Sequence, residues 1–140
     1  MRFGMNLFEI SAVVALDSTA SVLTFMPGIP IMVVRFGYIV TVLLDHTPNG
    51  LVLSLDKNDV IASPVRTELE LITAPTVDEV IGSIGYMDVS PGTRITPGEE
   101  IIVEVKTAAS NGDGRVFIEY TPLSWADMPL SGVHLPVDQE

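Results

Sequence analysis

The longest apolar run of the chain, IPIMVVRFGYIVTVLL at residues 29–44, constrains the fold more than any other stretch. A helix that spans a bilayer needs about 20 apolar residues, whereas this run is shorter and carries Arg35 in its middle. Its Val and Ile content favours a β-strand instead. Alternation predicts one apolar side made of Val34, Phe36, Tyr38, Val40, Val42 and Leu44, and a second made of Val33, Ile39 and Leu43.

A strand that is apolar on both sides should be covered on both faces. Hydrophobic residues make up 47% of the 140 residues, and a domain of this size has more surface than core. The surplus predicts that a neighbouring chain covers part of the surface. A well-filled core with strands buried on both faces is the alternative.

Elsewhere, short segments rich in Val, Ile and Thr alternate with turn residues, which is typical of an all-β sandwich or barrel. Pro27-Gly28, Pro91-Gly92 and Pro97-Gly98 mark turns, and Asn49-Gly50 suits a tight hairpin. The single short helix candidate is 76–84, and Gly82 and Gly85 disfavour a long helix there. We predict eight strands, at residues 6–16, 20–26, 31–44, 51–56, 66–73, 81–89, 99–108 and 114–121.

The stretch 96–122 shows one-sided alternation in its last two strands. Ile101, Val103 and Val105 share one face of the first strand, and Val116, Ile118 and Tyr120 share one face of the second. We expect these faces on the core, the opposite faces largely in water, and the two strands joined as an antiparallel hairpin through 107–113.

The C-terminal segment 123–140 is apolar but is broken by Pro and Gly at short intervals, which favours an extended course. We therefore predict an all-β fold: a single-domain, eight-stranded antiparallel jelly-roll sandwich at 1–122, followed by an extended C-terminal arm at 123–140. An immunoglobulin-like sandwich is the alternative fold. The arm lies against its own domain or a partner, and Trp125 either completes the core or anchors an interface.

No residue pattern points to catalysis or to a cofactor. The chain has no Cys and only two His, His46 and His134, and no serine stands in a nucleophile-elbow motif. Glu68 and Glu70 alternate with leucines, as on the solvated face of a half-buried strand. We expect no enzyme, no catalytic residue, no cofactor and no metal site.

Two short acidic segments faintly resemble calcium loops, namely residues 111–114 and the group Asp56, Asn58 and Asp59. Neither has the full spacing of oxygen ligands, and turns alone explain these residue types. The formal net charge of −11 makes nucleic acid an unlikely direct partner. The N-terminus shows no secretory signal pattern, so we expect a protein made in the cytoplasm.

The segment TPGEEIIVEVKTAASNGDGRVFIEYTPL resembles the closing hairpin of small jelly-roll decoration (cement) proteins of tailed bacteriophage heads. That family has a Pro-Gly-acidic opening, an alternating strand, a small-residue loop and a second strand ending in Tyr and Pro. Pro97, Gly98, Glu99, Tyr120 and Pro122 stand in those places, and the resemblance covers mainly residues 91–122.

The resemblance implies a structural virion protein, a homotrimer on the outer surface of a phage capsid that is assembled in the host cytoplasm. Its partners would be itself and the major capsid protein, with no nucleic acid and no membrane. For partner contacts we predict the residues Met1, Phe3, Leu123, Trp125, Met128, Leu130, Val133 and Leu135. The alternative function is a jelly-roll receptor- or carbohydrate-binding module of a phage tail or fibre.

Overall fold

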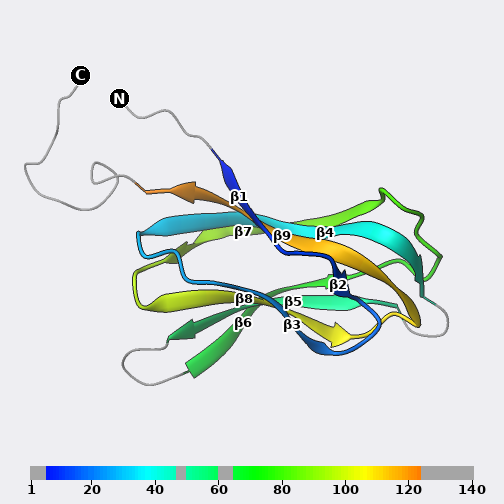
Figure 1. The fold of residues 1–140 in the computed structure, drawn as a ribbon. Helices are drawn as coiled ribbons and strands as arrows, with labels where there is room; N and C mark the ends of the chain where they lie inside the picture. The colour runs from blue at the N-terminus through cyan, green and yellow to red at the C-terminus, as the bar shows by residue number, and fades with distance from the viewer. Residues whose placement is uncertain (1–5, 47–49, 60–64, 124–140) are drawn as a thin grey trace, which may run out of the picture.

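A computed structural model describes residues 6–46, 50–59 and 65–123, which form two antiparallel β-sheets packed face to face (Figure 1). The all-β prediction is confirmed, because no helix occurs in these ranges. Their strands are β1 (Leu7–Ile10), β2 (Val14–Ala15), β3 (Ala20–Phe25), β4 (Ile31–Asp45), β5 (Val52–Asp59), β6 (Val65–Thr73), β7 (Ile84–Ile95), β8 (Glu99–Thr107) and β9 (Asn111–Pro122).

Between the described strands, the chain crosses from one sheet to the other at every connection except β1 to β2 and β5 to β6. Sheet A has the order β1-β9-β4-β7, with β2 also pairing with β9, and sheet B has the order β3-β8-β5-β6. The strand pairs are nested: β1 with β9, β3 with β8, β4 with β7, and β5 with β6. The chain therefore runs as one long double ribbon, and its first and last described strands lie side by side (Figure 1).

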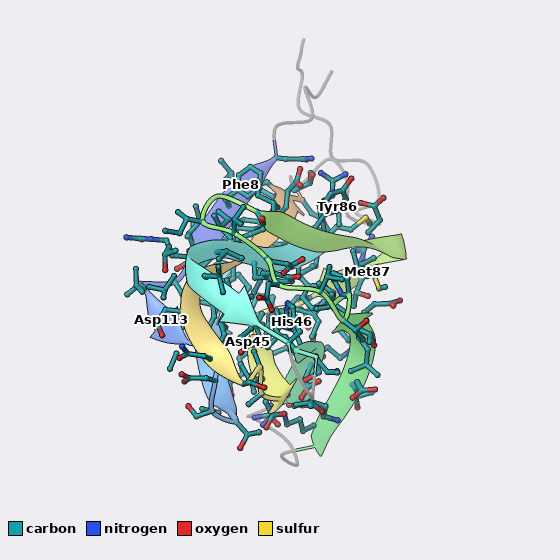
Figure 2. The ribbon with its side chains drawn as sticks, turned by 90° about the vertical axis from the view of Figure 1, so that its right-hand side faces the viewer. Phe8, Asp45, His46, Tyr86, Met87 and Asp113 are labelled. Atoms are coloured by element: carbon teal, nitrogen blue, oxygen red, sulfur yellow. The ribbon has the colours of Figure 1, made fainter. Side chains whose placement is uncertain are left out.

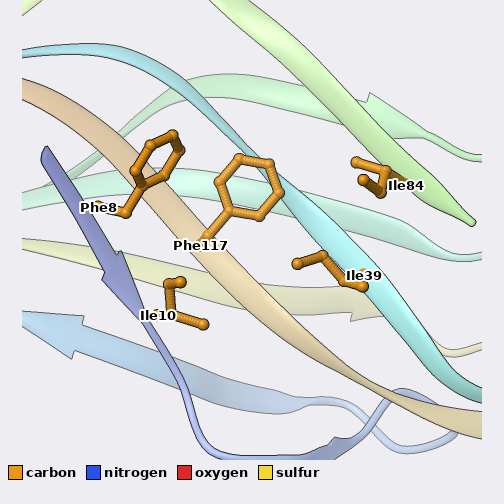
Figure 3. A pocket seen from close by; sticks show the side chains of 5 residues that line it. All are labelled: Phe8, Ile10, Ile39, Ile84 and Phe117. Atoms are coloured by element: carbon orange, nitrogen blue, oxygen red, sulfur yellow. The ribbon is translucent and has the colours of Figure 1, made fainter. Parts of the chain in front are cut away.

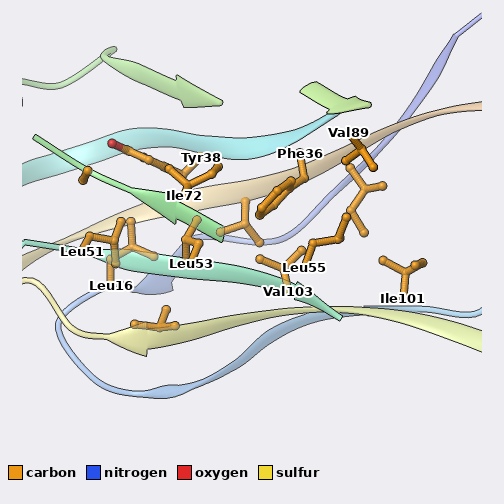
Figure 4. Close-up of a cluster of buried hydrophobic side chains, with 14 of the residues drawn as sticks. Leu16, Phe36, Tyr38, Leu51, Leu53, Leu55, Ile72, Val89, Ile101 and Val103 are labelled. Carbon is orange, nitrogen blue, oxygen red and sulfur yellow. The ribbon is translucent and has the colours of Figure 1, made fainter. Parts of the chain in front are cut away.

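The core fills the space between the sheets. Phe36 and Tyr38 of β4 point toward Leu53 and Leu55 of β5 (Figure 4), and all four are almost fully buried. Burying one side chain of this kind contributes about 1.5–3 kcal/mol. Because the inward faces of both sheets are continuous and apolar, the sandwich needs no other element to close its core.

The predicted strand 6–16 is split into β1 and β2, and Ser11 shows why. Its backbone N–H donates to the Val116 carbonyl at 2.9 Å, while its hydroxyl oxygen accepts from the Val116 N–H at 3.0 Å. Because the side chain takes the place of the backbone acceptor, the regular ladder ends there. The hydroxyl itself donates to the Ala12 carbonyl.

The two faces of β4 differ from the prediction. Val33 faces the core and is fully buried, whereas Val42 is exposed. Register shifts occur between Val33 and Arg35 and again between Val40 and Val42. Each shift marks an irregularity in the ladder, and an extra residue in a strand moves later side chains to the opposite face.

The predicted hairpin between the last two strands is wrong. The inward residues are as expected, since Ile101, Val103, Val105, Val116 and Ile118 are fully buried. However, β8 belongs to sheet B and β9 to sheet A, so residues 108–110 connect the two layers.

Two further turn predictions need correction. The connection at Asn49-Gly50 joins β4 to β5, which lie in different sheets and form no hairpin. Pro91-Gly92 lies inside β7, where four residues between Asp88 and Thr93 have no partner on β4. The helix candidate 76–84 contains a turn and an isolated bridge between Glu79 and Leu44.

Candidate interaction surface

The outer face of sheet A, which points away from the core, carries apolar side chains from four adjacent strands. The register places Ile10 of β1 beside Phe117 of β9, and Ile39 of β4 beside Ile84 of β7. Exposed apolar clusters of this kind mark interaction surfaces. The cluster, called here the outer patch, consists of Phe8, Ile10, Ile39, Ile84, Tyr86 and Phe117.

Two residues of the outer patch are more than half exposed to solvent. Ile84 is 58% exposed and Tyr86 is 57% exposed, and both belong to β7, the edge strand of sheet A. Figure 2 shows Phe8 and Tyr86 on the same outer side of sheet A, with His46 between the two sheets. The exposure of large apolar groups on one sheet face makes the outer patch a candidate interaction surface.

Gly37 allows the ring of Phe117 to lie against the sheet. A Cβ atom at Gly37 would stand 2.9 Å from Cζ of Phe117 and 2.8 Å from Cα of Tyr86, both closer than carbon atoms pack. The ring of Phe8 then meets that of Phe117 edge-on, with centroids 6.0 Å apart. The absence of a side chain at Gly37 therefore lets Phe117 lie close to the backbone of sheet A.

A hollow of about 240 Å³ opens in this surface (Figure 3). Its exposed lining is entirely apolar, and the residues that line it are Phe8, Ile10, Ile39, Ile84 and Phe117. An engineered cavity of about 150 Å³ with such a lining takes up benzene. This hollow therefore has room for an aliphatic or aromatic side chain.

A charged row borders the outer patch. The Nε of Arg35 donates to Asp88 at 2.7 Å, and its NH1 donates to Glu119 at 3.2 Å. The guanidinium also lies 4.8 Å from the ring centroid of Tyr86, and Asn6 donates to Glu119 at 2.7 Å. The hydrogen bond to Asp88 raises the pKa of Arg35. Arg35 thus pairs with both carboxylates and also stacks on the ring of Tyr86.

An exposed loop, called here the tip, precedes β7 and presents Val77, Val80 and Ile81 to solvent. The backbone of Glu79 bonds to that of Leu44 in both directions, at 2.9 and 3.0 Å. These bonds attach the tip to the end of β4.

Side chains from the core hold Glu79, which lies in the tip, by hydrogen bonds. The hydroxyl of Tyr38 donates to Oε1 of Glu79 at 2.7 Å. The backbone N–H of Leu51 donates to Nδ1 of His46 at 3.2 Å, so the ring proton is on Nε2, which faces Oε1 of Glu79 at 3.2 Å. Burial, and next its bond to Glu79, raises the pKa of Tyr38. The carboxylate of Glu79 is thus held by two donors from the core.

The outer face of sheet B is different in character, because cross-strand ion pairs cover it. Arg66 contacts Asp56 at 2.6 Å and Glu104 at 2.9 Å, and Lys106 contacts Glu68 at 2.6 Å. Lys57 and Glu99, and Asn58 and Glu100, make further contacts at 3.3 and 3.0 Å. Such a face is stable in water, so the two outer faces of the sandwich have opposite chemistry.

Of the predicted partner residues, Leu123 alone falls within the described ranges. It is half-buried, and its backbone N–H donates to the Pro30 carbonyl at 3.0 Å. The remaining ones lie outside the described residues: Met1, Phe3, Trp125, Met128, Leu130, Val133 and Leu135. The outer patch and the tip were not among the predicted contacts. In the sequence, the alternation of Phe8 and Ile10 around Glu9 was the signal for the part of the outer patch that lies on β1.

The acidic segments that resembled calcium loops have structural roles. Asp56 binds Arg66, and Asn58 donates to Glu100. Asn111–Gly114 begins β9, opposite β2 and β4. In the part of the chain that the structure describes, no group of three or more His, Asp or Glu side chains is placed to hold a metal ion.

Comparison with known proteins gives no assignment: no protein-family model and no curated sequence matches this chain. Over the described ranges, no helix has the length and apolarity that a membrane span requires.

Proposed function

We propose that this chain is a structural virion protein: a capsid decoration (cement) protein that binds the outer surface of a phage capsid as a homotrimer. The observation that carries the proposal is the contrast between the outer faces of the two sheets. An apolar face with a hollow supports contact with other protein surfaces, and an ion-paired face supports exposure to water.

We further propose that the sandwich is an eight-stranded jelly roll with an extended C-terminal arm. Its support is the nested strand pairing, from β1 with β9 inward to β5 with β6. A jelly roll is a long antiparallel ribbon rolled into two sheets, and β1 and β2 count as one strand in this description because both pair with β9.

The charge and the symmetry suit the role. A net charge of −11 keeps a decoration protein away from packaged nucleic acid and in solution before it binds. In a trimer, three modest contacts act together, since the first contact raises the effective concentration of the others. Binding to the assembled shell alone stabilises that shell by mass action.

The test has two measurements. Native mass spectrometry of the purified protein should give a trimer, and the protein should bind phage shells that lack decoration and raise their resistance to heat. A monomer that does not bind such shells would contradict the proposal. A variant without residues 124–140 should keep the melting temperature of the sandwich and bind shells more weakly if the arm contacts the capsid.

A further inference from the structure

We propose that the trimer forms by insertion of the tip of one copy into the hollow of the next copy. Val77, Val80 and Ile81 are the inserted side chains, and the outer patch is the surface that receives them. The inference rests on the proposed homotrimer and names the residues that hold it together.

The tip and the hollow match in chemistry. The hollow exposes only apolar atoms and has a volume of about 240 Å³. The tip offers three aliphatic side chains, of which Ile81 is 70% exposed. Each surface alone leaves apolar groups in water, and contact between them removes both from water at once.

The tip does not fill the hollow of its own chain. The Gly82 N–H donates to the Val40 carbonyl, and the Val40 N–H donates to the Ser83 carbonyl, both at 2.9 Å. Together with the bridge between Glu79 and Leu44, these bonds hold the loop alongside β4. In that position Ile81 remains exposed and the hollow stays open, so the tip of a second copy can enter it.

Charges beside the two surfaces are complementary. Asp78 lies within the tip and is exposed, and Arg115 lies beside the hollow, opposite Ile39 in the strand register. Arg115 donates to the Ser11 carbonyl, and among the described residues neither Arg115 nor Asp78 has an ion-pair partner. A second copy brings these opposite charges together.

The symmetry follows from the contact. The tip and the hollow are different surfaces, so their contact is heterologous, and heterologous contacts that close produce rings. A closed ring of three copies uses every tip and fills every hollow. A twofold dimer would instead place the same surface on both sides of the contact.

Cysteine cross-linking tests the contact directly, because the chain has no natural cysteine. The double variant Ile10→Cys/Ile81→Cys should form covalent dimers and trimers on mild oxidation. Within one chain, β9 and β4 separate β1 from the tip, which is bonded to β4. At about 4.8 Å per strand this separation is roughly 14 Å, beyond the ~7 Å between Cα atoms that a disulfide can bridge. The matched control Ile10→Cys/Leu71→Cys places the second thiol on sheet B and should stay monomeric on a denaturing gel.

The outcomes separate this inference from the proposed function. A wild-type trimer whose double variant gives no cross-link above the control overturns the tip–hollow contact and leaves the decoration role intact. A wild-type monomer overturns both. Cross-linking of Ile81→Cys alone indicates a twofold contact, and cross-linking that appears only after deletion of 124–140 indicates that the arm fills the hollow; each result overturns the inference.

Two substitutions give an independent measurement. Ile81→Ser should raise the midpoint concentration of trimer dissociation about tenfold or more, because burial of an Ile side chain is lost in every contact. Leu71→Ser removes an exposed leucine from sheet B and should change this midpoint concentration by less than about twofold. Asp78→Arg and Arg115→Asp should each weaken the trimer, and together they should restore it. If Ile81→Ser and Leu71→Ser raised the midpoint concentration of trimer dissociation equally, and neither changed the melting temperature, the inference would be overturned.

Discussion

Gly37→Ala provides a sensitive test of how the outer patch is built. The added Cβ would clash most closely with the backbone carbonyl oxygen of Gly85, and would stand 2.8 Å from Cα of Tyr86 and 2.9 Å from Cζ of Phe117. Carbon atoms prefer separations of about 3.5–4.0 Å, and β7 cannot move aside without losing its ladder with β4. The substitution therefore forces Phe117 or the strand out of place.

The magnitude follows from two opposing effects. Alanine is favoured over glycine within a strand by about 0.5–1 kcal/mol, whereas overpacking costs about 1–3 kcal/mol. Because two of the three clashing atoms belong to the backbone of β7, the steric cost dominates, and we expect a net loss of at least about 2 kcal/mol in the free energy of unfolding. In urea, where small proteins have m values of about 1–3 kcal/mol/M, the midpoint should fall by roughly 1 M.

Gly50→Ala is the matched control. A Cβ at Gly50 would lie 3.4 Å from its nearest neighbour, the Ala74 carbonyl oxygen, which is ordinary contact. Since the substitution there mainly restricts the unfolded chain, we expect no loss, and a gain of up to about 1 kcal/mol. Equal urea midpoints for Gly37→Ala and the wild-type protein would refute the close packing of β7 and Phe117 against Gly37.

Three further predictions concern the core and the outer face of sheet B. Tyr38→Phe should lower stability at neutral pH by about 1.5–3 kcal/mol, because a hydrogen bond to the carboxylate of Glu79 is lost. Since the pKa of Tyr38 is raised in the folded state, wild-type protein loses this advantage as pH rises above about 10, and the difference from the variant should narrow there in urea titrations. Lys106→Ala should cost less than about 1 kcal/mol, with the difference shrinking in 1 M salt, because its ion pair with Glu68 is exposed. Leu53→Ala should cost about 2–5 kcal/mol by chemical denaturation, and a smaller loss would mean that the core between the sheets is looser than described.

The sequence predicted inward faces better than strand partners. The alternation in β8 and β9 identified the residues that face the core, because side-chain period is a local property. However, Ile102, Phe117 and Glu119, on the faces expected in water, are buried as well. Their pairing was wrong because the glycine-rich segment between them resembles a hairpin turn. In the structure, the space that a Cβ of Gly112 would occupy is taken by Leu44, so this glycine serves close packing between β9 and β4.

The second face of β4 was predicted to need cover, and its outer side indeed carries Ile39 within the outer patch. The two irregularities in β4 have no sequence signal as clear as a proline, so the positions of Val33 and Val42 were reversed. Val77 and Val80 of the tip fell within the helix candidate 76–84, and Ile81 fell at the start of the predicted strand 81–89. Local patterns do not show whether such residues face the core or solvent.

Nested pairing also has a consequence for the order in which the protein folds. The outermost pair joins distant parts of the chain, as the hydrogen bond between Asn6 and Glu119 across 113 positions illustrates. Consider a circular permutant in which the present N- and C-termini are linked and the new termini lie between Asp59 and Val65. In this permutant β9 and β1 are neighbours in sequence, and the pair β5 and β6 becomes the most distant one. Since pairing of distant segments slows folding, the permutant should assemble sheet A early, and stopped-flow refolding would reveal a faster phase at the β1–β9 edge.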